Sequence, residues 1–412
     1  MQFVVVVPEF ATVADCYTDA KVLMRPVCGV PLLLRTLATA VRAGADDVLL
    51  VWPENAPTEL ADICMQSPLL RGPGTVRLLR VKNFDPRARP SWASVHGFDG
   101  QFMWLPWNWV TNKQSLVRLP LVGMDSVDWS RAAFVTTNEM TRGEIFTALP
   151  HRNVEGIAVI SPETAAAAEQ FLVVHSGKVL DGIHTSFNRR LCRPFVKWLS
   201  HTGITPNAVT FGGVAVSISS AIAFAGGFYW AYVAGALLFY IAGLFDEMDG
   251  MLARIKFADS PFGTWLEGFA DGLSYLLLFG GITVGLYRQY GSFELWIGAA
   301  LLTGTLLSVI ITSLQRKRAT TPDRPNEYLG RFYRLLENDS SNWISKMVRH
   351  LQAFQKRGVL IIYVVLFTLL GELPVLFYLS TLGSHLIWTL ALYFNHRFFK
   401  QPATGMAGIK AV

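Results

Sequence analysis

The sequence predicts an α/β domain followed by an all-α domain of six membrane-spanning helices. The chain has 412 residues, is 51% hydrophobic and only 16% charged, and its apolar excess lies in the second half. Up to about Leu180, short apolar runs mix with Pro, Gly and charged residues, as in a soluble α/β domain. After Asn207 come apolar stretches of about 20 residues, the length at which a helix crosses a bilayer. We therefore expect domains at 1–178 and 208–400, joined by an interfacial helix at 179–207.

The first part of the chain reads as alternating strand and helix. An apolar run from Phe3 to Val7 predicts a buried strand, because no basic leader or cleavage site marks it as a signal peptide. The segment Gly29-Val30-Pro31-Leu32-Leu33 opens a helix that reaches Ala43, and the run from Asp47 to Trp52 predicts the next strand. This alternating order predicts an α/β domain.

Six apolar stretches predict the membrane helices, the last of them short, near residues 208–227, 228–245, 262–286, 295–314, 359–379 and 384–394. Basic residues cluster before the first span, after the second and between Arg316 and Arg357, whereas the opposite loops hold only Arg288. The positive-inside bias then predicts a multi-pass protein of the inner membrane with both termini cytoplasmic. We attribute the net charge of +6 to this topology and to anionic membrane lipids, and expect no nucleic-acid partner.

The four cysteines carry no site signal. They stand far apart, without the paired spacing of a zinc site, and all lie on the predicted cytoplasmic side: Cys16, Cys28, Cys64 and Cys192. We expect them to be reduced.

Two amphipathic segments predict helices in the membrane interface. In the first, Phe187, Leu191, Phe195 and Leu199 recur every four residues while basic residues fall between them. Those basic residues serve either as an electrostatic anchor or, for one arginine, as a contact for a phosphorylated substrate, and the sequence leaves both open. The second helix is expected to begin with Ser340 or Ser341 as its N-cap.

Carboxylates gather at the end of the second span and the start of the third. Asp246, Asp249, Gly250 and Ala253 lie at i, i+3, i+4 and i+7, so they share one helix face, whereas Glu247 lies about 100° away and is excluded. On the next helix Gly263, Glu267 and Asp271 are spaced by four, after a natural cap and first turn at 259–261. One Asp at the membrane centre costs roughly 2.5 to 3.5 kcal/mol. Four converging carboxylates therefore predict a wet or cation-filled site, and oxygen-only ligands favour Mg²⁺ or Mn²⁺.

Small residues and an arginine accompany these carboxylates. Gly250, Ala253 and Gly263 leave room for a nucleotide to approach the backbone, and Arg254 can meet phosphate oxygens with its planar guanidinium. Ordinary helix packing with a snorkelling arginine would explain each residue alone. The complete array favours a binding site.

Read as one pattern, the two helices carry Asp246-x2-Asp249-Gly250-x2-Ala253-Arg254-x8-Gly263-x3-Glu267-x3-Asp271. This pattern closely resembles the signature of the CDP-alcohol phosphotransferase family. It departs at Glu267, where the family has Asp, while the other seven positions and every spacing agree. The resemblance extends upstream through Thr205-Pro206-Asn207-x2-Thr210, which in the family opens the first span and helps line the nucleotide pocket.

The resemblance implies transfer of a substituted phosphate from a CDP-linked donor to an alcohol, with release of CMP. It implies that Asp246, Asp249, Glu267 and Asp271 bind one or, as we expect, two divalent ions, and that Asp271 is also the general base. The CDP moiety would be held by Gly250, Ala253, Arg254 and Gly263, together with Pro206, Asn207 and Thr210. We expect the protein to form a homodimer.

The N-terminal domain resembles sugar-phosphate cytidylyltransferases, which belong to the nucleotidyltransferases, and this resemblance implies a Rossmann-like fold. The domain lacks two features of that family. Residues Pro8 to Lys21 replace the glycine-rich phosphate loop, and Asn108 falls where such domains carry a metal-binding Asp. We interpret the domain as degenerate, with a regulatory or structural role. Fusions of this kind resemble di-myo-inositol-phosphate-phosphate synthases and phosphatidylinositol-phosphate synthases, so an inositol phosphate is a possible acceptor beside glycerol phosphate or another polyol.

Two other functions stay open. Intramembrane carboxylates also mark cation-coupled transporters, although here the carboxylates lie at the cytoplasmic end and no paired interrupted helix occurs elsewhere. A catalytically inactive protein that only binds the CDP-alcohol gains weight from Glu267 and from the degenerate first domain.

Overall fold

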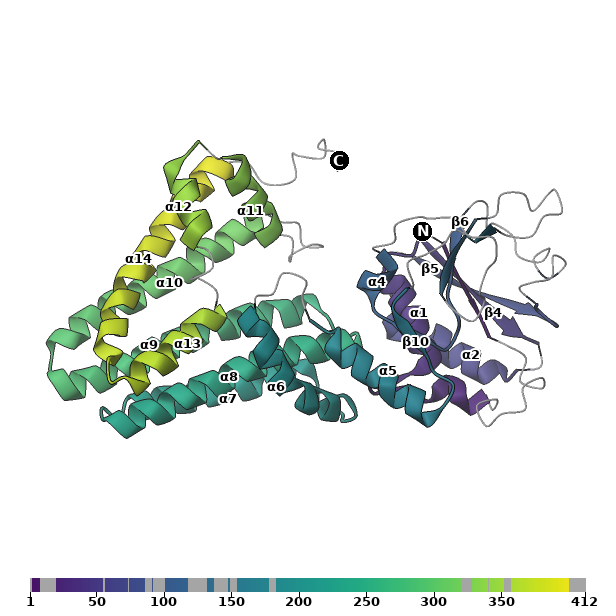
Figure 1. Ribbon diagram of the computed structural model, residues 1–412, viewed down its shortest axis with the longest axis horizontal. Coiled ribbons are helices and arrows are strands. Elements are labelled where there is room, and N and C mark those ends of the chain that lie inside the picture. The colour runs from purple at the N-terminus through teal and green to yellow at the C-terminus, as the bar shows by residue number, and fades with distance from the viewer. Residues whose placement is uncertain are drawn as a thin grey trace. The chain divides into compact units, whose positions relative to one another are not determined.

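The computed structural model describes residues 2–7, 20–54, 56–72, 74–85, 91, 101–117, 132–136, 147–148, 154–177, 183–319, 328–339, 341–351 and 357–399. The chain divides into two compact units, whose elements are labelled in Figure 1. The first unit comprises Met1–Val179, Arg193–Ile204 and Met251–Ala258, and the second comprises Leu180–Cys192, Thr205–Gly250 and Asp259–Val412. The end of one long helix, Met251 onwards, thus belongs to the first unit.

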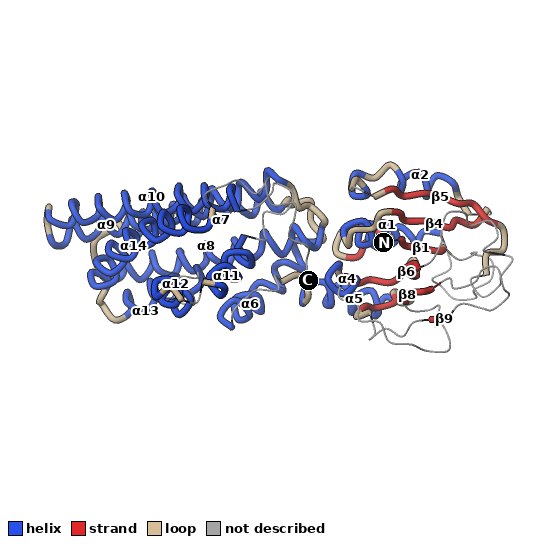
Figure 2. The backbone as a smooth tube through the Cα atoms, turned by 90° about the horizontal axis from the view of Figure 1, so that it is seen from above, coloured by secondary structure: helices blue, strands red, loops and turns tan. Residues whose placement is uncertain are grey.

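A six-stranded sheet forms the centre of the first unit, and Figure 2 shows its strands side by side. Its order is β5-β4-β1-β6-β8-β9, with the first four strands parallel and the last two antiparallel: β5 (Thr75–Val81), β4 (Asp47–Pro53), β1 (Gln2–Val6), β6 (Gln101–Trp104), β8 (Ala133–Thr136) and β9 (Thr147–Ala148). The predicted strands at 3–7 and 47–52 are confirmed as β1 and β4, which pair directly.

Two small antiparallel pairs and several helices complete this unit. The pairs are β2 (Pro26–Val27) with β3 (Val30–Pro31), and β7 (Trp109–Thr111) with β10 (Gly156–Ala158). The α-helices are α1 (Leu32–Arg42), α2 (Thr58–Met65), α4 (Lys113–Val117) and α5 (Pro162–Val174), with 3-10 turns at Ala20–Met24 and Pro68–Leu70. The predicted helix to Ala43 is confirmed as α1, whose buried residues include Arg35 among the apolar side chains.

The helices of the rest of the chain are α6 (Ile183–Ser200), α7 (Pro206–Phe224), α8 (Tyr229–Lys256), α9 (Pro261–Tyr290), α10 (Phe293–Ala319), α11 (Tyr328–Asn338), α12 (Trp343–Leu351), α13 (Arg357–Leu369) and α14 (Leu373–Phe398). Among the described residues, five helices are long and apolar enough to cross a membrane, namely α7, α8, α9, α10 and α14. A shorter apolar stretch, Val359–Leu369, lies in α13. Six apolar helices thus lie near the six predicted stretches, but among the described residues only five are long enough to span a membrane, so the count of six spans is not confirmed.

The boundary predicted between the last two spans was wrong. The sequence placed it after residue 379 and made the last span short, whereas α13 ends at Leu369 and α14 runs for 26 residues. The chain turns at Gly371, whose φ of 76° suits glycine, and Pro374 follows in the first turn of α14. The hydropathy pattern does not reveal this turn, because the residues on both sides of it are apolar.

The cap of α12 also differs from the prediction of Ser340 or Ser341. The Asn342 side-chain oxygen accepts a hydrogen bond from the backbone N–H of Ile344 at 3.0 Å, and the Asn342 backbone carbonyl accepts one from Lys346 N at 3.1 Å. Asn342 is therefore the N-cap, one or two residues later than expected.

Helix α6 is confirmed over most of the predicted amphipathic segment. Phe187 and Phe195 are exposed on it, at 60% and 59%, whereas Leu199 from the same four-residue series is buried at 7%. Cys192 and Val196 are buried beside Leu199, so the helix has one packed apolar face and one exposed apolar face. The exposed face is the one available to a membrane surface.

Three of the four cysteines lie among the described residues. Cys28, Cys64 and Cys192 are free and buried. Cys16 lies outside the described residues, as does most of the segment Pro8 to Lys21 that replaces the phosphate loop.

Candidate active site

The predicted site residues lie on three consecutive helices. Pro206, Asn207 and Thr210 form the start of α7, and Gly263, Glu267 and Asp271 lie in the first three turns of α9. The last three turns of α8 carry the others: Asp246, Asp249, Gly250, Ala253 and Arg254. The end of one helix and the beginnings of two others therefore supply the whole array.

Asp249 is the buried carboxylate of the array, with only 4% of its surface exposed. The hydroxyl of Thr210 donates a hydrogen bond to Asp249 Oδ2 at 2.5 Å, which joins α7 to α8. Asp246 and Glu267 both lie near enough to act on Asp249 electrostatically. The structure thus brings three of the four predicted carboxylates and Thr210 into one neighbourhood.

The starts of α7 and α9 meet at Gly263. The Ser260 hydroxyl caps α9 by accepting a hydrogen bond from Gly263 N at 2.9 Å, which confirms the predicted cap at 259–261. A Cβ atom on Gly263 would lie 3.1 Å from Ser260 Oγ and 3.3 Å from Asn207 Oδ1. Glycine therefore keeps the start of α9 close to the Asn207 side chain.

The remaining carboxylates are less enclosed. Asp246, Glu267 and Asp271 are all half-buried. Within the described part of the chain, no three His, Cys, Asp or Glu side chains are gathered closely enough to hold a metal ion. The convergence of all four carboxylates on a metal stays a prediction.

Arg254 has a protein partner that the sequence did not suggest. Its Nε donates to the backbone carbonyl of Ser176, which lies just after α5. Both residues belong to the first unit. Arg254 therefore hydrogen-bonds the protein backbone through its Nε, whereas the sequence analysis predicted that the residue binds the nucleotide.

Helix α6 packs on α8 next to the array. Arg189 Nε lies 3.4 Å from Glu247 Oε2, the Cys192 thiol donates to Leu244 O at 3.5 Å, and the Tyr240 hydroxyl donates to Asn188 Oδ1 at 3.0 Å. The carboxylate of Glu247 thus faces a basic residue of α6. Its exclusion from the site by helix geometry agrees with this pairing.

Sequence reasoning missed Arg35, which the structure connects to the same helix. Arg35 Nη2 donates to the carbonyl of Ile255, in the last turn of α8, at 2.9 Å. A signal was present, since Arg35 is the one charged residue in the apolar run of residues 32–41. An arginine at a core position of an amphipathic helix needs a buried partner.

The structure defines the class of this part of the chain. It is a bundle of membrane-length helices with an acidic, oxygen-only array at the adjoining ends of α7, α8 and α9. Residues 203–394 match the family model described as CDP-alcohol phosphatidyltransferase. These residues, just under half of the chain, therefore carry the domain that this family model describes.

Several curated proteins are similar to the chain. A phosphatidylinositol phosphate synthase of Mycobacteroides abscessus is 25% identical over 127 residues, which are 30% of this chain and 53% of that protein. A bifunctional IPC transferase and DIPP synthase of Aquifex aeolicus is 25% identical over 237 residues, 57% of this chain and 49% of that protein. An archaetidylinositol phosphate synthase of Methanothermobacter thermautotrophicus is 31% identical over 113 residues, 27% of this chain and 51% of that protein. The chain spans about half the length of the curated relatives it matches.

Among solved structures, the chain is similar to phosphatidylinositol phosphate synthase of Mycobacterium tuberculosis with CDP-DAG bound. The sequence identity is 18%, the TM-score is 0.34, and the match covers 54% of this chain and 100% of that one.

Proposed function

We propose that the protein transfers a substituted phosphate group from a CDP-linked donor to an alcohol acceptor and releases CMP. The observation that carries the proposal is the eight-position array on α8 and α9, set around the buried Asp249 in a domain of the CDP-alcohol phosphatidyltransferase family. The reaction belongs to phospholipid or polyol-phosphate biosynthesis. The donor is CDP-diacylglycerol or a CDP-polyol.

The carboxylates suit a divalent cation in charge and in atom type. Asp249 is buried, its hydroxyl partner Thr210 is neutral, and two further carboxylates act on it, so a cation would offset a concentrated negative charge. All-oxygen donors favour Mg²⁺ or Mn²⁺. We assign Asp246, Asp249, Glu267 and Asp271 to this role. When bound, the metal neutralises the donor diphosphate and the departing CMP.

We assign binding of the nucleotide to the small and polar residues around these carboxylates. Gly263 lies close to Asn207, and we assign Gly250 and Ala253 of α8 to the same nucleotide-binding role. Thr210 orients Asp249 through its hydroxyl. Arg254 contacts the donor phosphates with the part of its guanidinium that does not face Ser176, and Pro206 fixes the first turn of α7.

Asp271 takes the proton in this proposal. The acceptor hydroxyl attacks the phosphorus of the donor next to its alcohol group, the bond to the CMP oxygen breaks, and the hydroxyl proton passes to the Asp271 carboxylate. Asp271 lies one turn beyond Glu267 on α9 and is half-buried, so its carboxylate is accessible to an acceptor. The same residue completes the metal-binding set.

An inositol phosphate is the acceptor we propose. This proposal is supported by relatives that bear the names phosphatidylinositol phosphate synthase and archaetidylinositol phosphate synthase, which match 30% and 27% of this chain, and by the Aquifex relative, which matches 57% of it. We further propose that the protein is a homodimer. The distribution of basic residues predicts a protein of the inner membrane with both termini cytoplasmic.

A detergent-solubilised assay of CMP release tests the proposal. Purified chain is offered CDP-diacylglycerol and soluble CDP-alcohols, each with inositol phosphate, glycerol phosphate and inositol, in Mg²⁺, Mn²⁺ and chelator. We expect metal-dependent CMP release with CDP-diacylglycerol and inositol phosphate. CDP binding without CMP from any pair would indicate an inactive binding protein, and ion-driven flux into proteoliposomes without CMP would indicate a transporter.

A further inference from the structure

The C-terminal end of α8 has an unusual backbone. Phe257 follows the helix with a φ of 55°, and Ala258 N donates to Ala253 O at 2.9 Å, the hydrogen bond of a Schellman motif. Glycine normally occupies this left-handed position, because a side chain there costs about 1–2 kcal/mol. The Phe257 ring packs against the hydrophobic core of the first unit. A large apolar residue is thus held at a position where the backbone alone would favour glycine.

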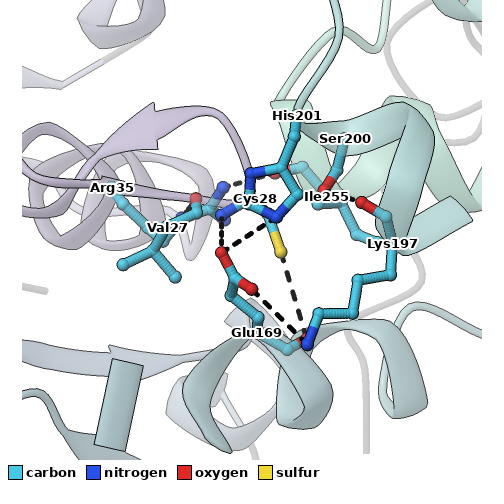
Figure 3. Close-up of polar contacts among 8 residues, drawn as sticks. All are labelled: Val27, Cys28, Arg35, Glu169, Lys197, Ser200, His201 and Ile255. Carbon is cyan, nitrogen blue, oxygen red and sulfur yellow. Dashed lines mark hydrogen bonds and ion pairs between the residues drawn. The ribbon is translucent and has the colours of Figure 1, made fainter. Parts of the chain in front are cut away.

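Arg35 of α1 closes the same helix end. Its guanidinium is 1% exposed and bridges two carbonyls, since Nε donates to Val27 O at 3.1 Å and Nη2 donates to Ile255 O at 2.9 Å (Figure 3). The guanidinium carbon also lies 5.1 Å from the centre of the Phe257 ring. Burial lowers the pKa of Arg35 to about 10, so the group remains charged at neutral pH. A positive charge here complements the negative end of the α8 dipole.

Four successive residues at the end of α8 are held within the first unit. Arg254 donates to Ser176 O, and Arg35 binds Ile255 O. Lys256 Nζ then donates to the carbonyls at 202 and 204, at 2.7 Å and 3.0 Å, and Arg42 Nη2 donates to Phe257 O at 3.1 Å. Backbone carbonyls at the C-terminal end of a helix lack an N–H donor within the helix. Here Arg35 and Arg42 supply donors to two of these carbonyls, and a hydrogen bond from a charged donor is stronger than one from a neutral donor.

The end of α6 is fixed beside them. Glu169 of α5 lies 3.1 Å from His201 Nε2 and 3.6 Å from Lys197 Nζ, and it accepts a hydrogen bond from Cys28 N at 3.2 Å (Figure 3). Gly29 has a φ of 74°, and a Cβ atom there would collide with the carbonyl oxygen of Ser200. The β2–β3 turn therefore accepts the backbone of α6 at close range.

We propose that Arg35 is a positioning residue for the membrane reaction, and that the first unit serves to hold the C-terminal end of α8. This inference rests on the proposed function, because α8 carries Asp246, Asp249 and Gly250. Asp249 precedes Ile255 by six residues, about 9 Å along a helix. A displacement of about 1 Å at reacting groups can cost about 10²-fold in rate. A unit without a phosphate loop thereby contributes to catalysis through the backbone of a helix.

The test uses Arg35→Met, which keeps the length of the side chain and removes both donors, and Arg35→Lys, which keeps the charge and one donor. Arg42→Met is a milder variant, because Arg42 is half-buried, whereas Arg35 is fully buried. The matched control is Arg77→Met. Arg77 belongs to the same unit and hydrogen-bonds Asp47, but it lies on β5 and is exposed.

Three measurements are made on each full-length variant: amide hydrogen exchange, Mn²⁺ affinity from the EPR signal of the free ion, and kcat for CMP release. In Arg35→Met we expect exchange at 251–258 to accelerate at least tenfold while β1 and β4 stay protected. We expect Mn²⁺ to bind at least fivefold more weakly and kcat to fall at least tenfold. Arg35→Lys should recover part of each loss, Arg42→Met should shift each in the same direction by less, and Arg77→Met should match the wild type.

The proposal is overturned if Arg35→Met leaves exchange at 251–258 unchanged, or if exchange rises while Mn²⁺ affinity and kcat do not change. Equal losses in Arg77→Met would overturn it as well, because they would show a general loss of stability. If Arg35→Met does not fold, Arg35→Lys and Arg42→Met decide by the same criteria. A wild-type chain that releases no CMP would refute the proposed function, and hydrogen exchange with Mn²⁺ binding would then decide on Arg35 alone.

Discussion

Asp271→Asn and Asp249→Asn are expected to impair different steps, the first turnover and the second binding. Asp271→Asn keeps the size of the side chain and removes the base, so CDP-donor binding should survive while turnover falls about 10²- to 10⁴-fold, the typical contribution of general-base catalysis. Asp249 is buried and bonded to Thr210, so Asp249→Asn should lose donor and metal binding together. Donor binding and CMP release are measured at saturating Mn²⁺. Recovery of Asp271→Asn turnover by added metal would show that Asp271 is a ligand only.

Glu267 is the position at which the array departs from the family pattern. Its extra methylene lets the carboxylate reach a metal from slightly further back, and Glu267 acts on Asp249 electrostatically in the structure. We expect Glu267→Asp to retain activity with an altered Mg²⁺/Mn²⁺ preference, and Glu267→Ala to lose activity. CMP release across a titration of each metal checks both. Normal activity of Glu267→Ala would remove this residue from the ligand set.

At the scale of residues, the sequence could predict what depends on local spacing. The positions on α8 and α9 follow helix periodicity, and Ser260 follows cap chemistry, so both were accessible. The partners of Arg35 and Arg254 were not, because Ile255 is 220 residues from Arg35 and Ser176 is 78 residues from Arg254. Contacts at such separation depend on how the units fold.

At the scale of elements, the turn between α13 and α14 gives a stability prediction. Gly371 has a φ of 76° and open space around its Cα atom, so Gly371→Ala should cost about 1–2 kcal/mol through backbone strain alone. Gly383 lies inside α14, also with open space, so Gly383→Ala should be neutral or slightly stabilising. Thermal unfolding in detergent compares the two. Equal effects would show that the turn is not strained by a side chain.

The α11–α12 segment is fastened to the end of α14 through Asp339. Arg397 donates to both carboxylate oxygens, at 2.8 Å and 2.7 Å, and Ser345 donates to Oδ2 at 2.7 Å. The hydrogen bonds from Arg397 and then from Ser345 lower the pKa of Asp339 to about 2. Because the folded pKa lies below the ordinary value near 4, this stabilisation is complete above about pH 4 and is lost as the pH falls toward 2.

Asp339→Asn should therefore loosen this segment at neutral pH, whereas the wild type should loosen only under acid conditions. Hydrogen exchange of α11 and α12 measures the effect, with α9 as the internal reference. Unchanged exchange in Asp339→Asn would contradict the assignment, as would a loss that appears in the wild type already above pH 5.

The boundaries of elements were harder to predict than their existence. Helices α7 to α10 coincide with apolar stretches of the sequence, because the length needed to cross a bilayer is a strong constraint. The turn at Gly371 was missed because apolar residues continue on both sides of it. Helix α8 extends eleven residues beyond the apolar stretch that ends at 245, through the acidic array and Arg254, and the helical spacing of Asp246 to Ala253 predicted this extension where hydropathy did not. Hydropathy marks the membrane and does not mark where a helix ends.

At the scale of the whole molecule, the sequence predicted an α/β part and a helical part, and the parallel strands β5, β4, β1 and β6 confirm the character of the first. It could not predict that residues 193–204 and 251–258 would belong to the first unit. Within this unit, Arg35 binds Ile255 in the last turn of α8, Arg42 binds Phe257 directly after α8, and Glu169 pairs with His201 directly after α6. A linear domain boundary is therefore a poor description of this chain.

The last prediction concerns nucleotide activation by the first unit. Asn108 falls where the resemblance to cytidylyltransferases predicts a metal-binding Asp. Its side-chain Nδ2 donates to Val159 O at 3.2 Å, and its backbone carbonyl accepts from Val159 N at 2.9 Å. The residue thus joins neighbouring backbone segments and supplies a neutral amide where a carboxylate would be needed to hold a cation. The sequence from Pro8 to Lys21 also lacks the glycine-rich loop that cradles phosphates.

We therefore expect the intact chain, with Asp271→Asn silencing the membrane site, to release no pyrophosphate from CTP with any sugar or polyol phosphate. Asn108→Asp should not restore the activity, because a carboxylate alone does not replace the missing phosphate loop. A coupled pyrophosphate assay in Mg²⁺ measures both variants, with an active cytidylyltransferase as the positive control. Pyrophosphate formation by either variant would assign a catalytic role to the first unit, and its contacts with the end of α8 would then connect two active sites within one chain.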